Sequence, residues 1–60
     1  MSDELRTMIE DAIKDEASDV EKYEKMSEMA LECDHERMSG VLLDIRHDEK
    51  THKMLLEQMI

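Results

Sequence analysis

Apolar residues recur every three or four positions in the first half of the chain, which predicts an amphipathic helix over residues 3–32. Its main stripe contains Leu5, Ile9, Ile13, Glu16, Val20, Tyr23, Ser27 and Ala30. A second apolar lane widens this stripe and contains Met8, Ala12, Met26 and Met29. A stripe of this width is typical of a helix that packs between two neighbours. Ser2 or Asp3 can cap its start.

A second stripe predicts a helix over about residues 36–60. Its members are Met38, Val41 or Leu42, Ile45, Glu49, His52, Leu56 and Met59. Residues 33–35 form the predicted turn, and Asp34 is the expected N-cap of the second helix. Ser39 is an alternative cap for a shorter helix, because Gly40 inside a helix costs about 1 kcal/mol relative to Ala. Residues 1–60 therefore predict one all-α, two-helix antiparallel hairpin.

Glu49 and His52 occupy positions of the second stripe where the pattern calls for Leu or Ile, and Glu16 lies on the first stripe. Glu49 and His52 lie three apart, so they are neighbours on one helix face. With the turn near residue 33 or 34, Glu16 lies level with positions 50–52 on the other helix. A buried carboxylate needs a partner or a metal ion, so Glu16, Glu49 and His52 are the candidate metal ligands.

One hairpin of 60 residues without Phe or Trp cannot bury much apolar surface, so we expect a homo-oligomer. Two hairpins related by a two-fold axis make a four-helix bundle with four glutamates and two histidines at one height. Two divalent cations would balance the four carboxylates. The pattern thus favours a dimer, or multiples of a dimer, around a di-metal site.

The formal net charge is −9, from 17 acidic and 8 basic residues. This balance excludes the basic footprint that nucleic-acid binding requires, and it disfavours anionic membrane surfaces. No apolar run approaches the length of a membrane span, and the first residues do not resemble a secretory leader. The single cysteine, Cys33, fits a reducing compartment. The expected location is cytoplasmic.

Glu16, Tyr23 seven residues later and the run Glu49-x-x-His52 together resemble half of a ferritin-like di-iron bundle of the rubrerythrin and ferritin type. The plan is most similar to that of the two-helix encapsulated ferritins, which build the site by dimerisation. The resemblance covers nearly the whole chain. It departs from rubrerythrins in having one cysteine instead of a four-cysteine iron module.

The resemblance implies two iron ions per dimer, with Glu49 bridging both and with Glu16 and His52 as terminal ligands. Tyr23 would place a hydroxyl near the metals and is the candidate catalytic residue. The implied activity is oxidation of Fe(II) by dioxygen or peroxide, as in a ferroxidase or a rubrerythrin-like peroxidase. Neither an electron donor nor a shell protein can be identified from the residues.

Two other functions remain open from the sequence. The chain can be a non-catalytic helical interaction module whose Glu16 and Glu49 pair with basic residues, or the same bundle can hold manganese or zinc. The turn residues Cys33, Asp34, His35 and Glu36 can form a surface metal site, but capping explains Asp34 without one. The stripe methionines are interpreted as adaptable core, and His47 as a surface histidine.

Overall fold

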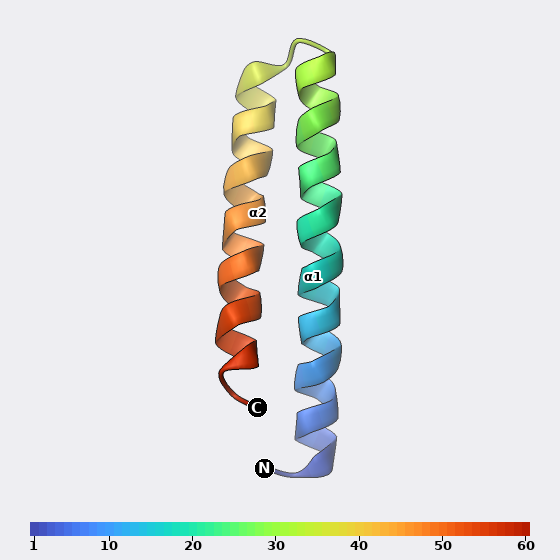
Figure 1. Cartoon of the computed structure of the whole chain (residues 1–60), viewed down its shortest axis with the longest axis vertical. Helices are drawn as coiled ribbons and strands as arrows, with labels where there is room; N and C mark the ends of the chain where they lie inside the picture. Colours follow the sequence, from blue (N-terminus) through green and yellow to red (C-terminus); the bar gives the residue numbers. More distant parts are fainter.

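A computed structural model describes residues 1–60 as two antiparallel helices that lie side by side (Figure 1). Helix α1 spans Asp3–Glu32 and helix α2 spans Glu36–Glu57, and there is no strand. The predicted all-helical hairpin is therefore confirmed. Neither helix contains a stretch that is long and apolar enough to cross a membrane.

Helix α1 begins as its sequence predicts. The Oγ of Ser2 accepts a hydrogen bond from the backbone N–H of Leu5 at 3.1 Å, which identifies Ser2 as the N-cap. Asp3 and Glu4 follow in the first turn, where negative charge interacts favourably with the positive end of the helix dipole.

The turn differs from the prediction that Asp34 caps α2. The backbone N–H of His35 donates to the carbonyl of Ala30 at 2.8 Å, and that of Asp34 donates to Leu31 at 3.0 Å. These two bonds form a Schellman motif, which ends α1 with Asp34 in the left-handed region at φ 62°. Asp34 therefore terminates the first helix, and the capping position of α2 is His35, whose side chain makes no capping bond. The prediction was wrong because the backbone N–H groups of Asp34 and His35 hydrogen-bond to the last carbonyl groups of α1, and these bonds determine the conformation of the turn.

The alternative of a shorter second helix capped by Ser39 is also wrong, because Ser39 and Gly40 lie inside α2. A Cβ at Gly40 would meet no heavy atom within 4 Å, so close helix contact does not require this glycine. Helix α2 ends at Glu57, three residues before the chain end expected from the pattern. Its last turn carries no basic residue to oppose the negative end of the dipole.

The contact between the helices is made by the predicted stripe of α1. Ile9, Ser27 and Ala30 are buried there, and Ile13, Glu16, Val20 and Tyr23 are half-buried. Ser27 meets Ser39 of α2, with 2.7 Å between their Oγ atoms, and the Ser27 hydroxyl also lies 3.3 Å from the Ser39 carbonyl oxygen. Because both serines are nearly fully buried, this polar pair fixes one register of α2 on α1.

The hairpin is long and thin, with Cα extents of 48 × 13 × 9 Å. Its radius of gyration is 14.2 Å, whereas a compact domain of this length would have about 10 Å. The expected methionine core is not formed within one chain, since Met8, Met29, Met38, Met54 and Met59 are all more than half exposed. In a single hairpin α1 has only one neighbouring helix, which covers most of the main stripe and leaves Met8 and Met29 of the second apolar lane exposed.

Candidate metal centre

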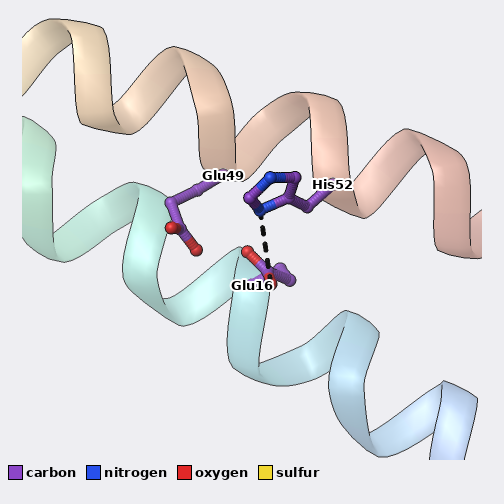
Figure 2. Close-up of side chains that lie close together, drawn as sticks. All are labelled: Glu16, Glu49 and His52. Atoms are coloured by element: carbon purple, nitrogen blue, oxygen red, sulfur yellow. Dashed lines mark ion pairs between the residues drawn. The ribbon is translucent and has the colours of Figure 1, made fainter.

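Glu16, Glu49 and His52 lie together across the hairpin, although they come from two helices. Figure 2 shows Glu49 and His52 extending from α2 toward Glu16 on α1. One ligand atom from each residue can be chosen so that all three lie within 4.8 Å of one another. The structure thus brings together the three residues singled out from the sequence, while their role as metal ligands stays a prediction.

The two carboxylate oxygens of Glu16 have different surroundings. Oε1 lies 3.8 Å from Nδ1 of His52, which is too far for a hydrogen bond and is an ion pair only when the imidazole is protonated. Oε2 is buried and has no hydrogen-bond partner. Because buried carboxylate oxygens are normally satisfied, this atom leaves a coordination position that a cation can take.

The pKa of the Glu49 carboxyl lies above its ordinary value. The leading cause is the Glu16 carboxyl, with which a protonated Glu49 can share a hydrogen bond, followed by partial desolvation. The negative charges of Glu16 and Asp19 raise the pKa further, and His52 opposes them. The site therefore concentrates negative charge in a half-buried position, which favours binding of a proton or a metal cation there.

The donor set fits a metal ion. Metal–oxygen and metal–nitrogen bonds of about 2.0–2.2 Å place two ligands of one metal roughly 3–4 Å apart, so small side-chain rotations suffice. The Glu16 side chain is 22% exposed and that of His52 is 55% exposed, so the group is buried on one side and open on the other. One hairpin supplies two carboxylates and one imidazole, which cannot enclose two metals.

Tyr23, the candidate catalytic residue, is half-buried on α1. It lies seven residues from Glu16, which is roughly 10 Å along a helix axis. Its hydroxyl takes part in none of the side-chain hydrogen bonds of the hairpin. Tyr23 is therefore partly covered, as its place on the stripe predicts, and its role near the metals stays a prediction.

Three contacts of the hairpin, one of them at the candidate centre, are not among those that the stripe pattern predicts. Asp19 lies three positions after Glu16, and its charge acts on Glu49. Arg46 pairs with Glu24 at 3.3 Å across the hairpin. The occurrence of Ser27 on an apolar stripe was a usable signal for the buried serine pair, whereas nothing in the pattern indicated that Arg46 lies against α1.

No family model, curated protein or solved structure matches the chain.

Proposed function

We propose that the chain is one half of a ferritin-like di-metal protein, in which two hairpins form a four-helix bundle and bind two iron ions between them. The observation that carries the proposal is the group of Glu16, Glu49 and His52, with an unpartnered buried oxygen on Glu16. In a dimer this group would occur twice, which matches the four glutamates and two histidines of a di-iron carboxylate bundle.

The surface of the single hairpin supports association with a second copy. The chain exposes 4763 Å², whereas a compact monomer of its 7.1 kDa would expose about 4,100 Å². Twelve large apolar side chains are exposed and only two apolar residues are buried. A second copy would cover part of this surface, and it would also supply the missing half of the ligand set.

The proposed reaction is oxidation of Fe(II). Each of two Fe(II) ions loses one electron, and dioxygen takes both electrons with two protons to give hydrogen peroxide. The chain would contribute positioning and charge, because carboxylate and imidazole donors fixed on two helices hold both cations at one height. The same donors tolerate manganese or zinc, so the metal preference has to be measured.

The direct test is anaerobic titration of the protein with Fe(II), followed by exposure to air. We expect one iron per chain and oxidation at one dioxygen per two iron ions. Glu16→Gln, Glu49→Gln and His52→Ala should each lower iron affinity by about tenfold or more. The matched controls Glu21→Gln and His47→Ala, both exposed on the same two helices, should bind as the wild type does.

Three results would contradict the proposal. Iron retention that is unchanged in all three ligand variants would show that Glu16, Glu49 and His52 do not bind the iron. Tighter retention of Zn(II) or Mn(II) than of iron, with no oxygen consumption, would show that the protein binds a metal without oxidising Fe(II). A wild-type chain that dimerises but retains no metal ion of any kind would favour the interaction module.

A further inference from the structure

A second group of metal-binding side chains lies at the turn end of the hairpin, away from Glu16, Glu49 and His52. It lines a cavity of about 350 Å³ that is open to solvent and lies between the end of α1 and the start of α2. The cavity is lined by Met26, Met29, Ala30, Cys33, His35, Met38 and Leu42. Five of these seven side chains carry sulfur or imidazole donors, and none carries a carboxylate.

The backbone of the turn holds the two strongest of these donors in place. The Schellman motif fixes Cys33 and His35 on either side of Asp34. The Cys33 thiol is free, and the His35 side chain makes no capping hydrogen bond although it occupies the N-cap position. Both donor groups are therefore available to a ligand.

The methionines add thioethers that the hairpin does not use for its own core. Met29 and Met38 are each 54% exposed and come from different helices, while Met26 is half-buried. Methionine has three rotatable bonds, so these thioethers can converge on an ion at small cost. Three thioethers beside one thiol make a soft donor set.

We propose that this turn-end cavity binds one Cu(I) ion through Cys33 and the thioethers of Met29 and Met38, with Met26 and His35 as further donors. Soft sulfur ligands select Cu(I), in contrast to the carboxylates of the candidate iron centre. Binding releases the thiol proton, and the resulting thiolate neutralises the single charge of Cu(I).

The copper site does not depend on the proposed di-iron function or on a dimer, because one chain supplies every donor. The two metal sites also use different residues. Glu49→Gln should therefore weaken iron binding and leave copper binding unchanged. Cys33→Ser should weaken copper binding and leave iron binding unchanged.

The test is anaerobic titration of the reduced full-length chain with Cu(I) in competition with bicinchoninate, whose copper complex is coloured. We expect one Cu(I) per chain. Cys33→Ser should lower the affinity by about a hundredfold, and the Met29→Leu/Met38→Leu double variant should lower it by about tenfold. The matched control is Met8→Leu/Met54→Leu, which removes two exposed methionines outside the cavity. Leu for Met conserves volume, so the fold should be retained, and circular dichroism checks this.

Three outcomes would overturn the proposal. Equal affinities of the two double variants would show that the thioethers of the cavity do not bind the ion. An unchanged affinity in Cys33→Ser would exclude the thiolate. Zn(II) that displaces Cu(I) at equal concentration would show that the cavity has no preference for a soft monovalent ion.

Discussion

At the scale of single residues, each candidate ligand has a distinct environment. Glu16 points one oxygen at His52 and keeps the other buried without a partner. The pKa of Glu49 is raised, first by the hydrogen bond that its protonated carboxyl can share with Glu16, then by partial desolvation and by the negative charges of Glu16 and Asp19. Without a cation, these contacts oppose folding near neutral pH, because like charges meet where water is partly excluded.

Neutralising Glu49 should stabilise the metal-free protein. Because the folded state holds the Glu49 proton more tightly than the unfolded state, the unfolding free energy contributed by this group falls as the pH rises through the folded pKa. Glu49→Gln removes the charge, so its thermal midpoint should exceed that of the wild type at pH 7 and match it in acid below the ordinary glutamate pKa. Melting curves of the chelated proteins across this range measure the difference.

The control for this prediction is Asp48→Asn, which removes a neighbouring exposed charge. It should leave the pH dependence of the midpoint close to that of the wild type. An equal gain at pH 7 in both variants would attribute the effect to the overall charge of −9 and not to the Glu16–Glu49 contact.

At the scale of the helices, a few specific contacts hold α1 and α2 in register. The buried Ser27–Ser39 pair lies near the turn, and the Arg46–Glu24 and His52–Glu16 pairs follow toward the open end. Small side chains at the serine pair allow close approach of the helices. This register places Glu16 level with α2 residues 49–52, so the serine pair determines the geometry of the candidate centre from about 17 Å away along the helix.

Gly40 offers a test of the helical description of α2. It lies inside the helix with open space where a Cβ would stand. Gly40→Ala should therefore raise the unfolding free energy by about 1 kcal/mol, because alanine loses less backbone entropy on folding. The corresponding increase of the thermal midpoint is about 4–8 °C for a domain of this size.

Ser18→Gly, at an exposed position inside α1, is the matched control and should lower the midpoint. A lower midpoint in Gly40→Ala would mean that Gly40 is needed for a close contact that a single hairpin does not contain, such as one with a second copy.

At the scale of the whole molecule, the hairpin is unusually thin for a folded protein. Only four of its 60 residues are buried, and twelve large apolar side chains are exposed. Since a marginal core seldom sustains a domain of this size, stability should depend on association.

We expect the thermal midpoint to rise with protein concentration and to rise again when Fe(II) or Mn(II) is added. A metal that binds only the folded dimer at a hundred times its dissociation constant adds about 2.7 kcal/mol. Val41→Glu should abolish both effects, because it places a charge on one of the two alternative members of the predicted stripe of α2, which a single hairpin leaves exposed, without touching a ligand. Light scattering and anaerobic melting curves measure these quantities.

The control is Leu43→Glu, which changes an exposed apolar residue two positions away and therefore on another side of the helix. It should keep the concentration dependence and the response to metal. A Val41→Glu variant that still dimerises and binds iron would place the interface elsewhere.

Much of the fold was predictable from the sequence because helical periodicity and capping are local. The stripe of α1 from Ile9 to Ala30 and the Ser2 cap are both present as predicted. The level of Glu16 relative to Glu49 and His52 also followed from the position of the turn, because an antiparallel hairpin pairs residues at equal distances from it. The periodic pattern therefore determined the two helices, and together with the position of the turn it determined the approximate level of the three polar residues.

The tertiary structure decided what the pattern left ambiguous. It assigned Asp34 to the end of α1, placed Ser39 in a buried pair, and turned His52 to the open edge of the contact. It also left most methionines exposed and gathered three of them around Cys33. Periodicity specifies that a helix face is apolar, but a broad face can meet more than one neighbour. Only the packing of α2 on α1 determines which part of that face is already covered and which part is still free.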